Sequence, residues 1–223
     1  MASTSTAKKK STKKDLRAKI LEAYQEQLLL KGENPASVYA FCKDLGISES
    51  EFYQHFSDFE AVASQFWIGI FKESTKRLGG SPEWDEFMVR EKLLTFYYSF
   101  FEAIKGHRSY ALLTLKGSLL GFKKEFADIK DLKTDYKKWL KGLINEGQAQ
   151  GEIAGRSKLS DIYDDIFWYQ FMFLLDFWRK DRSSNFEKTD EAIEKSVNLS
   201  FDLIEKNALD SAFDFGKFIF QNR

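Results

Sequence analysis

The chain has 223 residues and a mass of 26.0 kDa, with 43% hydrophobic, 16% aromatic and 30% charged residues, a composition typical of a folded globular protein. Its 34 basic and 34 acidic side chains give a net charge of zero. The presence of only two prolines favours long helices over a turn-rich β-sandwich. A single cysteine excludes a disulfide framework and a Cys cluster for metal, and the chain has only two histidines. It has no secretory signal, and no apolar run of about 18 residues that could span a membrane. We therefore expect a cytoplasmic protein with no metal, cofactor or membrane partner.

The charge is distributed unevenly. Residues 1–19 carry seven basic side chains and one acidic one, a net charge of +6, whereas residues 20–60 carry two basic and eight acidic ones, a net charge of −6. Residues 1–14 show no apolar periodicity, which predicts a disordered basic arm. Such an arm is either a solubilising tail or, beside a DNA-binding body, a segment that contacts phosphates or the minor groove.

From Asp15 the apolar residues recur every three or four positions, which predicts a helix that ends at Lys31-Gly32. Asn34-Pro35 then begins a second, short helix, which Gly46 stops. The segment Ser48-Glu49-Ser50-Glu51 has the pattern of a capping box and opens a third helix with Phe52 and Phe56 inward. A second capping box, Ser57 to Glu60, begins a longer helix.

Three short helices in about 45 residues, with Leu45-Gly46-Ile47-Ser48 between the second and third, predict a helix-turn-helix. Gly46 permits the tight turn, Ile47 is expected to fill it from the core side, and Ser48 caps the projecting helix. The stretch Ile20 to Val62 resembles the DNA-binding domain of the TetR family of bacterial transcriptional regulators. The resemblance is carried by the sequences ILEA at 20–23, SVYAF at 37–41, LGIS at 45–48, FYQHF at 52–56 and FEAV at 59–62.

The resemblance implies a homodimer that binds palindromic double-stranded DNA and is controlled by a small ligand. The candidate DNA-binding residues are Lys13, Lys14, Ser37, Lys43, Ser48, Ser50, Tyr53, Gln54 and His55. The third helix departs from the family pattern, because Glu49 stands where Lys or another donor is common and Glu51 where Thr is common, and carboxylates repel phosphates. These carboxylates either cap the helix or, in one case, accept a hydrogen bond from a cytosine amino group. The alternative function is therefore a helical dimer that keeps the fold, has weak or lost DNA binding, and binds a ligand or a protein.

The rest of the chain is also expected to be helical. Apolar periodicity predicts a long helix from Trp84 to Gly106, and others at 110–120, around Tyr136 to Ile144, at 160–180, at 187–206 and near 209–220. The 160–180 helix is apolar on nearly every side, which predicts burial on more than one face, either against a second subunit or at the centre of a large monomeric bundle.

The family resemblance assigns roles to these helices. It implies that 160–180 and 187–206 form the dimer interface, with Trp168, Met172, Leu175, Leu199 and Leu203 as contacts. It also implies a pocket for a small apolar ligand, lined by Phe96, Tyr97, Phe100, Trp139, Phe167 and Phe171, although an aromatic stripe of this kind also suits a packed core. Tyr97, Tyr169 and Gln170 are the polar residues expected in that interior.

No phosphate-binding loop, dinucleotide fingerprint or nucleophile-elbow motif occurs, so we expect no enzyme and no catalytic residues. The predicted fold is all-α, with an N-terminal three-helix helix-turn-helix domain followed by a larger helical bundle for ligand binding and dimerisation. The expected boundaries are an arm at 1–14, the helix-turn-helix at 15–60, a connecting helix at 61–80 and the bundle at 81–223.

Overall fold

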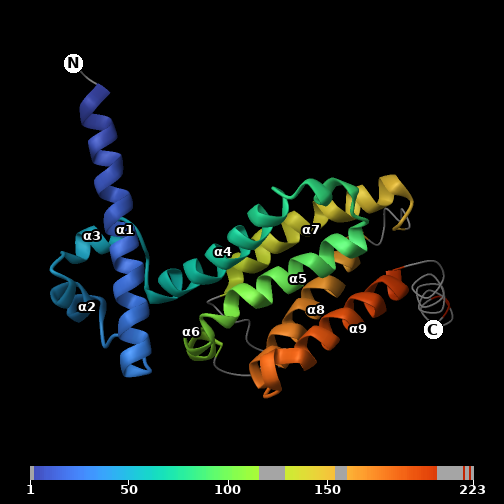
Figure 1. Cartoon of the computed structure of the whole chain (residues 1–223). Coiled ribbons are helices and arrows are strands. Elements are labelled where there is room, and N and C mark those ends of the chain that lie inside the picture. The colour runs from blue at the N-terminus through green and yellow to red at the C-terminus, as the bar shows by residue number, and fades with distance from the viewer. Residues whose placement is uncertain (1–2, 116–128, 154–159, 205–217, 219–220, 222–223) are drawn as a thin grey trace. The chain divides into compact units, whose positions relative to one another are not determined.

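The protein is represented by a computed structural model that describes residues 3–115, 129–153 and 160–204, with Phe218 and Gln221. For residues 3–14, Lys130 and 160–162 it describes the backbone alone. Within these ranges every element is a helix, which confirms the predicted all-α fold (Figure 1).

The described helices fall into two compact units. The first unit contains α1 (Ser3–Lys31), α2 (Val38–Leu45), α3 (Glu49–Tyr53), α4 (Phe59–Leu78) as far as Ile70, and α6 (Arg108–Thr114). The second contains the end of α4, the 3-10 helix η1 (Pro82–Glu86), α5 (Val89–Lys105) as far as Ala103, most of α7 (Lys130–Gln150), α8 (Ser160–Lys180), the short 3-10 helix η3 (Ser184–Phe186) and α9 (Glu187–Ile204).

Helix α1 is longer than the sequence pattern predicts. It begins at Ser3, so residues 3–14, expected to be disordered, continue the helix of residues 15–31. This segment contains no glycine or proline and half of its residues are lysine or alanine, which are good helix formers, so nothing in it breaks the helix. The C-terminal end is as predicted: α1 stops at Lys31, and Gly32 takes the left-handed conformation with φ of 71°.

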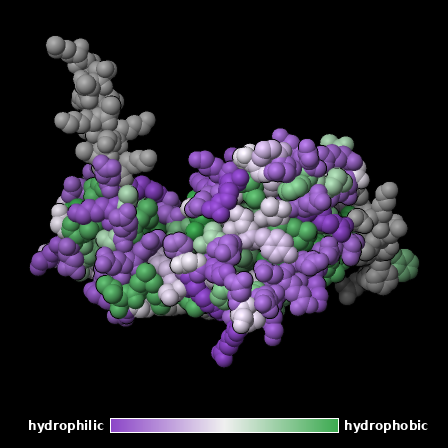
Figure 2. Space-filling model, in the orientation of Figure 1, coloured by the Kyte–Doolittle hydropathy of each residue, from purple (hydrophilic) through white to green (hydrophobic). Residues whose placement is uncertain are grey.

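Aromatic rings hold the first unit together. Phe52 of α3 is fully buried, and its ring lies 6.1 Å from that of Phe41 and 5.8 Å from that of Phe59. Tyr24 of α1 stacks on Phe59 at 5.5 Å and donates a hydrogen bond to Asn34 at 2.8 Å. One ring from each of α1, α2, α3 and α4 thus meets in one small core. Figure 2 shows hydrophilic atoms over most of the surface and hydrophobic atoms near the C-terminal end of α1.

Three predicted helix starts are corrected by the structure. Helix α2 begins at Val38, with the Ser37 hydroxyl as its N-cap, rather than at Asn34-Pro35. The cap of α4 is Asp58, whose carboxylate accepts from the Ala61 amide at 2.7 Å, whereas the sequence pattern favours Ser57. Helix α5 begins at Val89 rather than at Trp84, which lies in η1. The Glu152 carboxylate, distant in sequence, accepts hydrogen bonds from the amides of Val89 at 2.7 Å and Arg90 at 3.0 Å, and so fixes where α5 starts.

The remaining helices of the second unit follow the predictions closely. Helix α8 has the predicted bounds, 160–180, and α7 contains the predicted residues Tyr136 to Ile144 and extends beyond them at both ends. Helices α8 and α9 pack against each other (Figure 1). The expected helix near 209–220 and the end of the one at 110–120 lie outside the described residues. None of the helices in the described ranges is long and apolar enough to cross a membrane.

Candidate functional site

The turn between α2 and α3 has the predicted geometry. Gly46 adopts the left-handed conformation, with φ of 71° and ψ of 35°, and the Ile47 amide donates to the Cys42 carbonyl at 3.0 Å. Ser48 caps α3 by accepting from the Glu51 amide at 3.2 Å, and the Glu51 carboxylate accepts from the Ser48 amide at 2.9 Å. The predicted capping box is therefore confirmed, and it fixes the direction in which α3 leaves the turn.

Fully buried Phe52 anchors α3, so the residues around it on the helix face outward. Glu49, Ser50 and Gln54 are exposed, and Tyr53 is 54% exposed. His55 follows the helix, half-buried, with its ring 6.5 Å from that of Phe56. The structure brings these predicted DNA-binding residues together on and next to one short helix.

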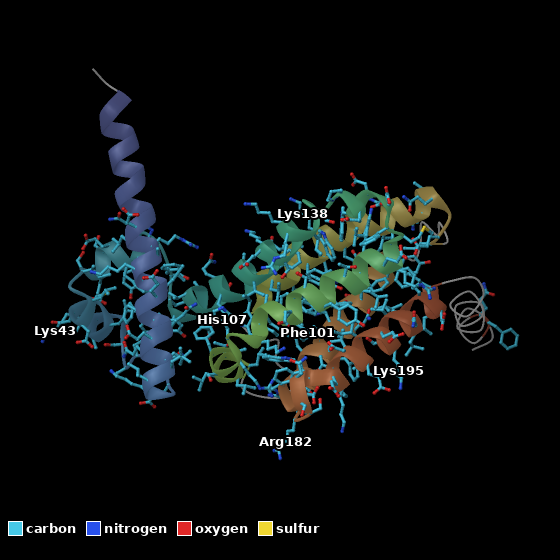
Figure 3. All side chains as sticks on the ribbon, viewed as in Figure 1. Lys43, Phe101, His107, Lys138, Arg182 and Lys195 are labelled. Atoms are coloured by element: carbon cyan, nitrogen blue, oxygen red, sulfur yellow. The ribbon has the colours of Figure 1, made fainter. Side chains whose placement is uncertain are left out.

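The other predicted DNA-binding residues occupy different positions. Ser37 is the N-cap of α2, where its hydroxyl accepts from the Ala40 amide at 3.1 Å. Lys43 is exposed in the last turn of α2 and points away from the helix (Figure 3). The side chains of Lys13 and Lys14 lie outside the described set.

Two basic residues near the N-terminus are used inside the first unit. The Arg17 guanidinium lies over the Phe56 ring at 5.1 Å and donates to Gln65 of α4. Lys19 donates to the Leu45 carbonyl at 3.1 Å, at the C-terminal end of α2 where a cation is favourable. The positive charge that residues 1–19 can offer a partner therefore resides chiefly in the five lysines of residues 8–14.

The acidic side chains of α3 affect the electrostatic potential of the helix-turn-helix domain, which we call the head. Burial raises the pKa of the Cys42 thiol, and the nearby carboxylates of Glu49 and Glu51 raise it further. Hydrogen bonds from the Ser48 amide and hydroxyl lower the pKa of Glu51. Glu51 is therefore occupied by the cap, and Glu49 has no hydrogen-bond or ion-pair partner among the described residues.

The residues predicted to line a ligand pocket form one aromatic cluster in the second unit. The Phe96 and Trp139 rings are 4.5 Å apart, and the Phe171 ring lies 5.0 Å from that of Phe100 and 5.8 Å from that of Tyr97. Phe167, also buried, packs on Phe201 of α9 at 5.7 Å. Ring-to-ring contacts of this density are those of a packed core.

A pair of buried tyrosines supplies the polar groups of this cluster. The hydroxyls of Tyr97 and Tyr136 are 2.7 Å apart, and the Tyr136 hydroxyl donates to the Phe167 carbonyl at 3.3 Å. Both side chains are 0% exposed, and burial raises the pKa of each phenol well above its ordinary value. The sequence pattern does not identify Tyr136 as a polar residue of this interior, because its position on an apolar helix face is also that of a core residue.

The outer face of α8 and α9 differs from the prediction. Of the five expected dimer contacts, Trp168, Met172 and Leu175 are buried within their own subunit, whereas Leu199 and Leu203 are 59% and 38% exposed. Tyr169, expected in the interior, is 57% exposed, and Phe173 is 38% exposed. Gln170 is buried and links the two helices, because it donates to Ser196 and accepts from Ser200 at 3.1 and 3.0 Å.

This face is hollowed between the two helices. A depression of about 420 Å³ is lined by Phe173, Phe177, Lys188, Glu191, Ala192, Lys195, Ser196 and Leu199. A second one, of about 560 Å³, shares Phe173, Phe177 and Lys188 and extends to the start of α9. Lys195 points outward from α9 and forms an ion pair with Glu191 at 2.5 Å (Figure 3). Within the described ranges, no group of three or more His, Cys, Asp or Glu side chains could hold a metal ion.

Comparisons with known proteins agree with this architecture. Residues 92–219 match the family described as tetracycline repressor-like, C-terminal domain. No curated protein matches the chain. Among solved structures, a protein of unknown function from Rhodococcus sp. RHA1 is similar, with a TM-score of 0.55 and 16% identity over 86% of this chain and 96% of that one. At this identity the likeness concerns the fold.

Proposed function

Because the chain belongs to the tetracycline repressor-like family, whose C-terminal domain matches residues 92–219, we propose that it is a transcriptional regulator that binds palindromic operator DNA as a homodimer. Such a regulator acts in the cytoplasm, where it meets the chromosome. The observation that carries this proposal is the α2–α3 turn. Its left-handed Gly46 and the capped start of α3 present a short helix whose exposed side chains are polar. Helix-turn-helix proteins insert such a helix into the major groove.

The α8–α9 face is the proposed dimer interface. Phe173, Leu199 and Leu203 expose apolar surface along two adjacent helices, with the depressions described above between them. An apolar patch of this kind is stabilised when a second subunit covers it. A two-fold axis would also give two copies of α3, which can reach two half-sites about one turn of DNA apart.

A small apolar or aromatic ligand is the proposed effector, bound in the second unit at the aromatic cluster. Phe96, Trp139 and Phe171 offer ring surfaces, and the Tyr97–Tyr136 pair offers hydroxyls. A ligand that inserts between these rings must displace existing ring contacts, so binding requires the helices α5, α7 and α8 to shift. Such a shift is how occupation of the site would be transmitted to the rest of the chain.

The test is a selection of duplex DNA from a random pool by the purified full-length protein at near-physiological salt. Enrichment of a palindrome supports the proposal and gives the half-site spacing. If a folded dimer in the same sample enriches no sequence, with and without candidate apolar ligands, the proposal fails.

The basic N-terminal segment is proposed to supply much of the non-specific affinity. Each phosphate neutralised by a lysine contributes about 0.9 to the slope of log affinity against log salt. Deletion of residues 1–14 removes five lysines from each subunit and should make that slope shallower. An unchanged slope would assign the segment to solubility alone.

A second candidate function is favoured by the charge of the head. Residues 20–60 carry a net charge of −6, and two carboxylates lie in the first turn of α3. A dimer with these properties could bind a ligand or a protein through its second unit and have weak or no affinity for DNA. Thermal stabilisation by an apolar ligand, together with no selected DNA sequence in the ligand's presence or absence, would favour this candidate.

A further inference from the structure

We propose that Glu49 is a specificity-determining residue of the head, which selects a cytosine in each operator half-site by accepting a hydrogen bond from its exocyclic amino group. The inference rests on the proposed DNA-binding function and assigns the base chemistry that α3 reads.

The two carboxylates of α3 have different surroundings in the structure. The Glu51 side chain accepts from both the amide and the hydroxyl of Ser48, at 2.9 and 2.8 Å. One of its oxygens, Oε2, is therefore directed back onto the helix start. Glu49 is exposed and has no such partner among the described residues. Glu49 is thus the carboxylate of α3 whose two oxygens both remain for a partner outside the chain.

The position of Glu49 on α3 is suited to base contact. In helix-turn-helix proteins the N-terminal residues of the second helix contact base edges. Glu49 is the first residue of α3, and the i,i+4 spacing places Tyr53 on the same side of the helix. Both side chains are exposed, whereas Phe52 is fully buried and packs its ring against those of Phe41 and Phe59. The buried ring holds α3 on the domain, and Glu49 and Tyr53 remain accessible to a partner.

The chemistry of a carboxylate favours one base. An ionised carboxylate only accepts hydrogen bonds, so in the major groove it needs an amino group, which cytosine and adenine present. Guanine presents two acceptors and thymine an acceptor and a methyl group, and both exclude a carboxylate. Adenine places its N7 acceptor beside the amino group, where it repels the second carboxylate oxygen, and therefore cytosine is the preferred partner.

A carboxylate in the groove also weakens binding to every wrong sequence. Phosphates on both sides repel it, and only the amino group of the correct base compensates. Glu49 is therefore expected to lower non-specific affinity and to raise the ratio of specific to non-specific binding. This role accounts for an acidic side chain on a helix that faces DNA.

The experiment compares DNA selections by the full-length protein and three variants: Glu49→Gln, Glu51→Gln and Asp44→Asn. The wild type should enrich a palindrome with one cytosine fixed in each half-site, and its replacement by guanine should weaken binding about tenfold. The sites selected by Glu49→Gln should carry guanine or adenine at that position, because the glutamine amide can both donate and accept a hydrogen bond. It should also bind non-specific duplex DNA more tightly than the wild type.

Glu51→Gln and Asp44→Asn are matched controls. Each removes one negative charge from the head: Asp44 is exposed on α2, and Glu51 belongs to the cap of α3. Both variants therefore show the effect of the lost charge on DNA binding without the loss of a base contact. Both should retain the cytosine preference, and thermal unfolding should show that all variants fold. A wild-type palindrome whose base preferences are the same in Glu49→Gln overturns the inference and leaves the regulator intact. If no palindrome is enriched at all, the proposed function itself fails.

Discussion

The buried hydroxyls of Tyr97 and Tyr136 allow the energetics of the second unit to be tested by a double-mutant cycle. The hydrogen of Tyr136 goes to the Phe167 carbonyl, so in their mutual bond Tyr97 is the donor and Tyr136 the acceptor. The three groups form a chain with a direction. Replacing each tyrosine by phenylalanine removes one hydroxyl and leaves the ring in place, so the packing of the cluster is preserved.

The direction of the chain predicts unequal effects. Tyr97→Phe removes one neutral hydrogen bond and leaves Tyr136 still bonded to Phe167, a loss of about 1 kcal/mol in the free energy of unfolding. Tyr136→Phe leaves the Tyr97 hydroxyl, which is fully buried, with no partner and should cost about 2 kcal/mol. The double variant has no unpaired hydroxyl and should cost about 1 kcal/mol, much less than the sum of the single variants.

Chemical denaturation of the four proteins, followed by tryptophan fluorescence and circular dichroism, measures these differences. The two probes should give coincident transitions before free energies are compared. Equal losses in the two single variants would contradict the assigned direction of the chain. Additive losses in the double variant would show that the two hydroxyls do not interact, and would refute the reasoning.

Three further predictions concern pH, packing and assembly. Burial raises the pKa of both phenols, so the folded state resists their ionisation while the unfolded state does not. The free energy of unfolding should therefore fall as the pH rises above about 10. The fall should be steeper in the wild type than in the double phenylalanine variant. In α7, Gly142→Ala should raise the melting temperature, because a Cβ there meets no atom within 4 Å and alanine favours helix by about 1 kcal/mol. Gly147→Ala should lower it, because a Cβ there would lie 2.8 Å from Ile153, and calorimetry that ranks the two variants in the opposite order would contradict the packing. Phe173→Glu should raise the dissociation constant of the dimer about a hundredfold, because an unpaired carboxylate would be buried in the interface. Leu30→Glu, at a 78% exposed position of α1, should leave this constant unchanged. Analytical ultracentrifugation measures both.

The predictions that succeeded rest on local chemistry. Gly46 and Gly32 end their helices in the left-handed conformation, as a glycine after a helical pattern indicates. The capping box at Ser48 requires only residues within one turn, and the structure contains it. The family resemblance, read from residues 20–62, is confirmed by the match of residues 92–219 to the tetracycline repressor-like C-terminal domain.

The failures have two physical causes. The start of α5 depends on Glu152, which lies more than sixty residues along the chain, and no local pattern contains that contact. Helix α8 is apolar on nearly all sides, so its sequence has no polar face to tell which side is inward. Trp168 and Leu175, expected at the dimer interface, are buried within the subunit, whereas Phe173 and Tyr169 are exposed. The positions of α5, α7 and α9 around α8 decide between these faces.

The contacts of the basic side chains in the head indicate which residues would provide affinity for DNA and which would provide sequence specificity. Arg17 and Lys19, the basic residues of α1 nearest the turn, are held by Gln65, Phe56 and the end of α2, so they stabilise the head. Attraction to phosphates then depends on the lysines of residues 8–14 and on exposed Lys43. Removing the N-terminal lysines should therefore weaken binding to all sequences alike, while changes on α3 alter which sequence is chosen.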